Sequence, residues 1–73
     1  MKQEFEIDLW IYPEDIVKQA ISDFEDVWKP NPTPFLKGEG NIRSIEINWE
    51  NKEEIEEIFR EFMNYCIWLI NEQ

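Results

Sequence analysis

Apolar and polar residues alternate along residues 4–11, which is the first clear pattern in the chain. One set of alternate positions is acidic except for one tryptophan, namely Glu4, Glu6, Asp8 and Trp10. The other set is entirely apolar, namely Phe5, Ile7, Leu9 and Ile11. A period of two is typical of a strand with one buried face, so we expect a β-strand over residues 4–11.

From Pro13 to about Trp28 the apolar residues recur at intervals of three or four. This spacing places them on one stripe of an α-helix: Ile16, Val17, Ala20, Ile21, Phe24, Val27 and Trp28. Pro13 suits the first helical turn, where its missing N–H is not needed, and Pro30 prevents the helix from continuing. We therefore expect one helix over residues 13–28.

Residues 29–40 contain three alternating prolines, followed by Phe35, Leu36 and two glycines. Prolines favour an extended, stiff backbone without regular hydrogen bonds. The segment Thr33–Lys37 is compatible with a short edge strand, joined by a turn over residues 38–41 to the strand that follows. An ordered Pro-rich loop explains the same residues equally well, so both interpretations stay open here.

The second alternating pattern covers residues 42–49, where Ile45, Ile47 and Trp49 share one face of an expected strand. Asn51 is a good helix N-cap, with Glu54 three residues later. A helix is then expected over residues 52–70. Its apolar stripe comprises Ile55, Ile58, Phe59, Phe62, Cys66, Leu69 and Ile70.

These elements follow one another as β-α-(β)-β-α, with no repeat and no linker between them. The chain has 73 residues, which suffices for one small domain over residues 1–73. We expect an α+β fold: a small open-faced layer, with a two- or three-stranded sheet backed by two helices. The acidic positions of both strands would then lie on the uncovered face of the sheet.

The C-terminal helix carries more apolar residues than one stripe requires. Asn64 is the only polar residue among positions 62–70. Four apolar residues lie off the main stripe, namely Met63, Tyr65, Ile67 and Trp68. They either pack within the chain against the Pro-rich segment and Phe35 and Leu36, or form with those residues a surface for a partner or a second copy.

The chain is strongly acidic, with 17 Asp and Glu against 7 Lys and Arg, for a net charge of −10. Direct binding to nucleic acid or to anionic lipid is therefore not expected. Two candidate acidic surfaces are the uncovered sheet face, with Glu4, Glu6, Asp8 and Glu46, and the last helix, with Glu53, Glu56, Glu57 and Glu61. They either keep the fold solvated or complement a basic partner.

The chain holds few residues that support catalysis. It has no histidine, so the usual base for a Ser or Cys nucleophile and the usual zinc ligands are missing. Its single cysteine, Cys66, lies in the apolar run and is expected in the core. We therefore expect no enzyme, no metal site and no cofactor. Without a signal peptide or an apolar run long enough to span a bilayer, we expect a soluble cytoplasmic protein.

One segment resembles a known family. Residues Asp8-Leu9-Trp10-Ile11-Tyr12-Pro13-Glu14-Asp15-Ile16-Val17-Lys18-Gln19-Ala20, with Phe24 a turn later, resemble the opening of the HxsD-type proteins. These are small accessory proteins of His-Xaa-Ser peptide-modification systems, which also encode radical-SAM maturases. Phe62-Met63-Asn64 is similar to a pattern in the family's closing helix, whereas the Pro-rich segment and the ending Asn71-Glu72-Gln73 depart from it. The resemblance implies an adaptor that acts beside a maturase or its peptide.

The sequence therefore leads to two hypotheses about function. The first is a non-enzymatic acidic adaptor that binds a protein or peptide, with a homodimer as one form of that binding. Its site would combine Met63, Tyr65, Ile67, Trp68, Phe35 and Leu36. The alternative is an acidic inhibitor that imitates nucleic acid, of the anti-restriction or anti-CRISPR type, or a toxin-immunity protein. It would use the two acidic surfaces instead.

Overall fold

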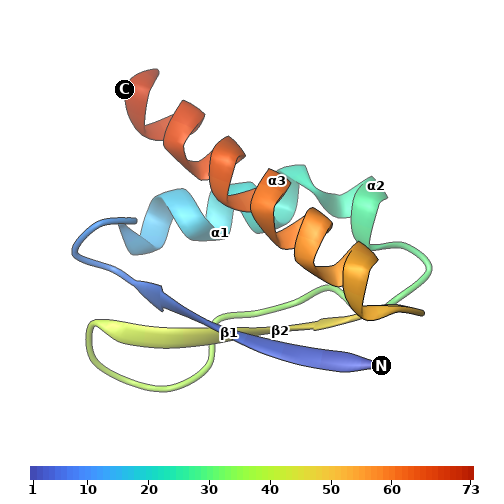
Figure 1. Cartoon of the computed structure of the whole chain (residues 1–73). Coiled ribbons are helices and arrows are strands. Elements are labelled where there is room, and N and C mark those ends of the chain that lie inside the picture. The colour runs from blue at the N-terminus through green and yellow to red at the C-terminus, as the bar shows by residue number, and fades with distance from the viewer.

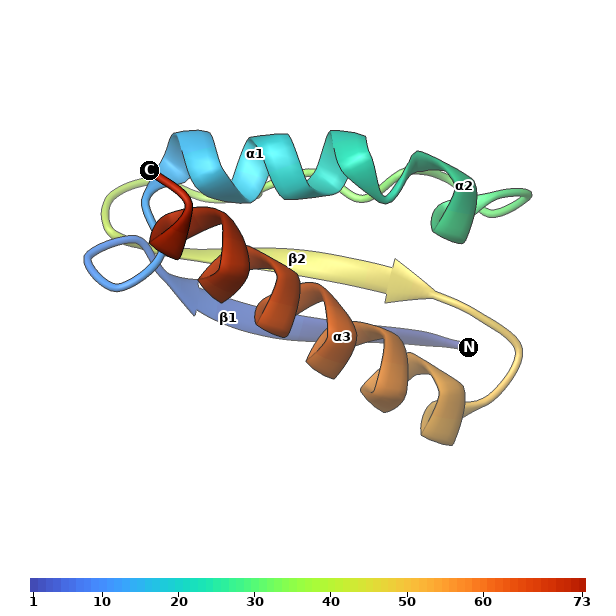
Figure 2. The same cartoon turned by 90° about the horizontal axis from the view of Figure 1, so that it is seen from above.

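The computed structural model describes all 73 residues and contains two strands and three helices. In chain order they are β1 (Lys2–Asp8), α1 (Glu14–Asp23), α2 (Glu25–Trp28), β2 (Ile42–Asn48) and α3 (Lys52–Asn71). The two strands form one antiparallel sheet, in which Phe5 lies opposite Ile45. The helices all lie on the same side of this sheet (Figures 1 and 2). This is the expected open-faced α+β layer, with two strands.

The core lies between the sheet and the helices and contains only apolar side chains. Eleven apolar residues are buried, namely Ile7, Ile16, Val17, Ala20, Ile21, Trp28, Ile45, Ile47, Ile55, Phe62 and Cys66. The expected strand and helix stripes therefore face one another. An isolated pair of strands is marginal in water, so the packing of α1 and α3 onto this sheet supplies most of its stability.

Four aromatic side chains join the helices to one another. Phe24 lies 5.6 Å from Phe62 of α3 and 5.3 Å from Tyr65, measured between ring centroids, and Trp28 lies 5.8 Å from Phe62. The Phe24 and Phe62 rings meet edge to face, one of the favoured aromatic geometries. The indole N–H of the buried Trp28 donates to the carbonyl of Ile21 at 2.9 Å, so its polar atom is satisfied.

The expected helix over residues 13–28 is divided at Phe24, whose φ of −88° and ψ of 14° mark a turn. The Ile21 carbonyl that receives the Trp28 indole is the acceptor that a continuous helix would offer to the N–H of Glu25. Side-chain bonding and packing of Trp28 therefore accompany the break. The apolar stripe is kept across it, which is why the periodicity alone indicated one helix.

The first strand begins and ends earlier than residues 4–11. The Asp8 carboxylate accepts the N–H of Trp10 at 2.9 Å, and the Asp8 carbonyl accepts the N–H groups of Ile11 and Tyr12. These bonds form a turn at residues 9–11, and an Asp at its start is a typical cause of such a turn. Ile11 consequently leaves the buried face and is 63% exposed, whereas Leu9 packs against the core.

The Pro-rich segment follows the outer edge of β2 but forms only one bridge to it, between Lys37 and Ser44. The two residues exchange both backbone hydrogen bonds, at 2.8 and 3.1 Å. Proline holds φ near about −65°, whereas an antiparallel strand needs about −140°, so the preceding residues run extended without a ladder. Of the two interpretations left open by the sequence, the structure shows a loop with a single bridge.

Helix α3 begins as expected, because the Asn51 side chain accepts the N–H of Glu54 at 2.8 Å. It runs diagonally over the sheet, and its C-terminal end rises away from the strands, above α1 (Figures 1 and 2). The ring of Phe59 stacks on Phe5 of β1, with centroids 3.9 Å apart, and Tyr65 contacts the end of α1. None of the helices combines the length and the apolar character needed to cross a membrane.

Candidate protein-binding surface

The six residues of the first hypothesis fall into two groups in the structure. Met63, Tyr65 and Leu36 are partly buried and pack against the core. Phe35, Ile67 and Trp68 remain exposed, with exposed fractions of 64%, 44% and 53%. The fold therefore hides half of the apolar surplus and leaves the other half in water.

The three exposed residues do not form one surface. Phe35 lines a hollow together with Glu46 and Asn48, whose side chains alternate with the buried Ile45 and Ile47 along β2. Because alternate side chains point to opposite faces, this hollow lies on the helix-free face of the sheet. Ile67 and Trp68 lie on α3, on the other side of the sheet. The structure thus separates the Pro-rich part of the expected surface from its helical part.

Trp68 lies on the outer face of α3, the face turned away from the core. Residues at spacings of four, three and four share one side of a helix, which places Glu57, Glu61, Asn64 and Trp68 in one row. All four are exposed. This outer face is acidic in its first half and ends in an exposed indole, so parts of both sequence hypotheses meet on it.

The exposed indole is held in position by its neighbour. The ring of Trp68 stacks on that of Tyr65, with centroids 5.6 Å apart and an angle of 22° between the planes. The Tyr65 hydroxyl in turn donates to the carboxylate of Asp23 at the end of α1. This hydrogen bond raises the pKa of Tyr65, because ionisation would place a second negative charge beside Asp23. Trp68 is therefore exposed but not isolated, a property expected of an aromatic anchor.

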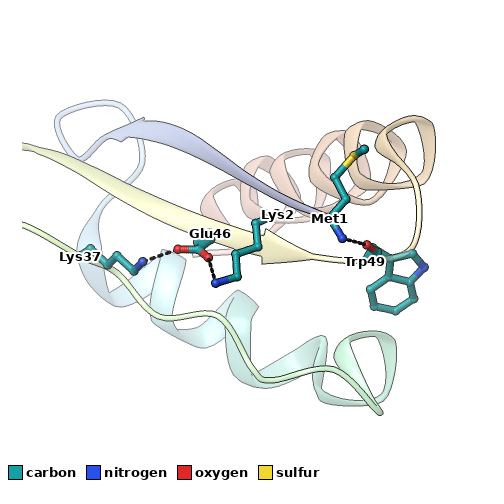
Figure 3. A network of polar contacts seen from close by, with 5 residues as sticks. All are labelled: Met1, Lys2, Lys37, Glu46 and Trp49. Atoms are coloured by element: carbon teal, nitrogen blue, oxygen red, sulfur yellow. Dashed lines mark hydrogen bonds and ion pairs between the residues drawn. The ribbon is translucent and has the colours of Figure 1, made fainter.

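The helix-free face is less acidic than the sequence indicated, because Glu46 lies between two lysines (Figure 3). Its carboxylate is 2.6 Å from the Lys37 ammonium and 3.7 Å from that of Lys2. The hydrogen bond from Lys37 lowers the pKa of Glu46, and the same bond raises the pKa of Lys37. Glu46 is thus neutralised locally, and it does not belong to a free acidic surface.

A hollow of about 250 Å³ beside this ion pair is lined by the same three charged residues and by the Pro-rich segment. The Lys37 ammonium lies 5.7 Å from the centroid of Phe35, which favours a cation–π contact. Figure 3 also shows the amino group of Met1 beside Trp49, where two backbone hydrogen bonds of 2.9 Å close the end of the sheet. The lining of the hollow thus combines two lysines and one glutamate with the exposed ring of Phe35.

Most of the remaining residues of the acidic hypothesis form no ion pair within the chain. Glu4 and Glu6 are exposed and form no ion pair, and Asp8 is partly buried in its turn. On α3 the ion pairs include only Glu56, which lies 4.0 Å from Lys52, while Glu53, Glu57 and Glu61 remain unpaired. The acidic residues of the sheet and of α3 therefore form two separate regions.

A third exposed apolar group was only partly indicated by the sequence. Trp10 is 80% exposed, Ile11 63% and Ile42 52%, and all three lie where β1 ends and β2 begins. The sequence placed Trp10 on the uncovered face, but placed Ile11 in the core. The available signal was Asp8, whose type favours a turn directly before these residues.

The chain has a single thiol, Cys66, and its other common metal ligands are Asp and Glu side chains. Cys66 is fully buried, and burial raises the pKa of its thiol to about 11, so it is protonated at neutral pH. No group of three or more Cys, Asp and Glu side chains is arranged to hold a metal ion.

A comparison with known protein families, curated proteins and solved structures finds no match to this chain. The resemblance to HxsD-type proteins stays an expectation from the sequence.

Proposed function

We propose that this chain is a non-enzymatic protein-binding module that contacts its partner through the C-terminal half of α3. The observation that carries this proposal is the exposure of Ile67 and Trp68 in a helix whose other apolar residues pack against the core. Tryptophan is enriched among residues that dominate binding energy at interfaces. Water exposure of these two side chains costs free energy in the free protein, and a partner that covers them recovers it.

The surroundings of Trp68 favour a particular partner chemistry. Glu57 and Glu61 precede it on the outer face of α3, and neither has an ion-pair partner within the chain. A partner that offers an apolar pocket flanked by Lys or Arg would complement this face. The net charge of −10 would also speed the encounter with such a partner at low salt. The HxsD-type resemblance adds one candidate class, a peptide-maturation enzyme or its substrate peptide.

The test compares two exposed aromatic residues on opposite sides of the sheet. The chain is used as bait in its host cells as wild type, Trp68→Glu and Phe35→Glu, and each protein that binds is then purified. Isothermal calorimetry with the purified partner should show binding to wild type and Phe35→Glu, and at least about tenfold weaker binding to Trp68→Glu. Equal affinity of all three chains would contradict the proposal.

The same partner distinguishes the acidic hypothesis. An inhibitor that imitates nucleic acid would depend mainly on charge, so its binding would fall steeply with salt. The double variants Glu57→Lys with Glu61→Lys, and Glu4→Lys with Glu6→Lys, would then abolish binding, whereas Trp68→Glu would change it little. For the proposed module the expected order is reversed, with Trp68→Glu having the largest effect. Circular dichroism of each variant checks that the fold is retained.

A further inference from the structure

The edge of β1 that faces away from β2 is open. Met1 and Trp49 exchange both backbone hydrogen bonds, and the N–H of Leu9 donates to Asn41. In an antiparallel pair such bonded positions alternate, so the odd-numbered residues of β1 bond to β2. The N–H and C=O groups of Lys2, Glu4 and Glu6 therefore point away from β2. The sheet has no strand on that side.

The opposite edge of the sheet shows how such an edge is covered in this molecule. Ser44 lies opposite Glu6, so its backbone groups point away from β1, and they bond to Lys37 of the extended Pro-rich segment. On the helix-free face the side chain of Lys37 forms an ion pair with Glu46. One edge of the sheet is therefore covered by an extended segment that places a cation beside a strand carboxylate.

The open edge carries the carboxylates for the same arrangement. Glu4 lies directly opposite Glu46, an unfavourable pair of like charges, and both Lys2 and Lys37 form their ion pairs with Glu46. Across the helix-free face the charged side chains therefore follow one another in the order Glu4, Glu46 and Lys37. A cation beyond Glu4 would complete this row, and no basic side chain of the chain forms an ion pair with Glu4 or Glu6.

Helix α3 crosses over β1 and provides an apolar contact on the helix side of the sheet (Figure 2). Phe59 stacks on Phe5 of β1, and Met63 and Ile67 follow it at intervals of four residues. The three side chains therefore lie along one flank of α3, of which Phe59 is the residue that contacts β1. Toward its C-terminal end the helix rises away from the sheet, so Met63 and Ile67 lie farther from the strands (Figure 1). Tyr65, which bonds to Asp23 of α1, marks the opposite flank.

We propose that the open edge of β1 accepts an extended segment of a partner protein, in which basic and apolar residues alternate. Its backbone would pair with Lys2, Glu4 and Glu6, as in other cases of strand addition. Its basic side chains would lie beside Glu4 and Glu6 on the helix-free face, and its apolar side chains would lie on the helix side of the sheet, beside the stacked rings of Phe5 and Phe59. This deepens the proposed function, because it gives the partner a conformation and a charge pattern.

A second copy of the chain is a poorer occupant of this edge. Each copy carries a net charge of −10, and an edge-to-edge dimer would bring Glu4 and Glu6 of both copies together. Charged side chains at an edge commonly prevent such self-pairing. They do not oppose an incoming strand of opposite charge. The charge pattern therefore selects a basic partner segment over self-association.

The test uses a capped synthetic peptide of alternating Val and Lys, titrated into the isotope-labelled chain and followed by NMR. The backbone amides of Lys2, Glu4 and Glu6 should shift and become protected from hydrogen exchange, because they gain acceptors. A control peptide of the same composition, with N-methyl groups on alternate residues, cannot donate those hydrogen bonds and should bind at least about tenfold more weakly. Equal binding of both peptides, or shifts confined to the acidic residues of α3, would overturn the proposal.

A proline substitution separates backbone pairing from charge. The Glu4 N–H points away from β2, so Glu4→Pro removes a donor of the open edge without removing a bond of the sheet. Glu4→Gln removes only the charge. Peptide binding should weaken for both variants at low salt, and the additional weakening caused by Glu4→Pro should persist at high salt, where the effect of the charge is screened. Equal weakening that disappears at high salt would indicate charge attraction alone and would overturn strand addition.

Two further measurements separate the remaining outcomes. Trp68→Glu should leave peptide binding unchanged, because Trp68 lies on the outer face of α3. The binding surface proposed at Trp68 and the open edge of β1 are therefore tested independently, and either proposal can fail alone. Light scattering of the free chain should give a monomer. A dimer that Glu4→Pro dissociates would show that a second copy occupies the edge, which would overturn the assignment to a basic partner segment.

Discussion

The two faces of the sheet differ in how their residues are stabilised. On the helix side, Ile7, Ile45 and Ile47 are at most 1% exposed and belong to the hydrophobic core. On the helix-free side, no second layer covers the strands, and Glu46 is held by Lys2 and Lys37. A single layer of helices therefore buries the whole core, while the other face depends on ion pairs exposed to solvent. We expect substitutions on the two faces to differ accordingly.

The largest difference should appear between two phenylalanines. Phe62 is fully buried, so Phe62→Ala should lower the free energy of unfolding by about 3–5 kcal/mol, through lost burial and the cavity left behind. Phe35→Ala on the helix-free face should change it by less than about 0.5 kcal/mol. Urea denaturation followed by circular dichroism measures both. A similar loss for the two variants would show that the Phe35 side chain stabilises the fold as a buried side chain does.

Two tryptophans sharpen the same comparison. Trp28→Phe removes the indole that donates to the Ile21 carbonyl and leaves that buried acceptor unpaired, so we expect a loss of about 2–3 kcal/mol. Trp10→Phe, at a side chain that is 80% exposed, should be almost neutral. The midpoint of thermal unfolding compares the variants. An unchanged midpoint for Trp28→Phe would mean that the bond at the break between α1 and α2 contributes nothing.

The buried thiol predicts a pH dependence for the core side. The pKa of Cys66 is raised to about 11 in the folded chain. The contribution of the protonated thiol to the free energy of unfolding is therefore complete at pH values below the ordinary thiol pKa. This contribution is lost as the pH rises toward 11, because the unfolded chain ionises first and is thereby favoured. The loss should reach roughly 2 kcal/mol, and Cys66→Ala should lack it. Urea denaturation between pH 8 and pH 11 measures the free energy of unfolding of both chains. An equal change for wild type and Cys66→Ala over this range would contradict this account.

The smallest expected effect belongs to the ion pair on the helix-free face. The pKa of Glu46 is lowered in the folded chain, so the ionised carboxylate stabilises the fold at pH values above the ordinary carboxyl pKa. This stabilisation is lost as the pH falls through the lowered pKa. Glu46→Gln should therefore decrease the unfolding midpoint slightly at neutral pH and low salt, and less at high salt. Glu39→Gln, at an exposed loop position without an ion pair, is the matched control. Equal effects would show that the pair with Lys37 is not stabilising.

Much of the fold could be predicted from local patterns. The alternation around Phe5 and Ile45 and the stripe through Ile55 and Phe62 identified both strands, the last helix and the buried face. The Asn51 cap fixed the start of α3. These features depend on periodicity and on side chains close in sequence, and no tertiary contact overrides them. The end of β1 and the break at Phe24 were missed, because they coincide with side-chain hydrogen bonds of Asp8 and Trp28 that no periodicity indicates.

From the sequence, the candidate surface could be predicted only as an excess of apolar residues in the last helix. The amino-acid sequence by itself determined the charge, the open-faced layer and the presence of more apolar residues near Trp68 than one stripe needs. Only the tertiary structure decided that Met63 and Tyr65 pack inward, and that Trp68 faces water on an acidic helix. It also decided that Phe35 lies across the sheet from that helix, because alternate residues of an extended segment face opposite sides. Which parts of a surplus remain exposed depends on distant segments meeting in space, and no local pattern encodes that.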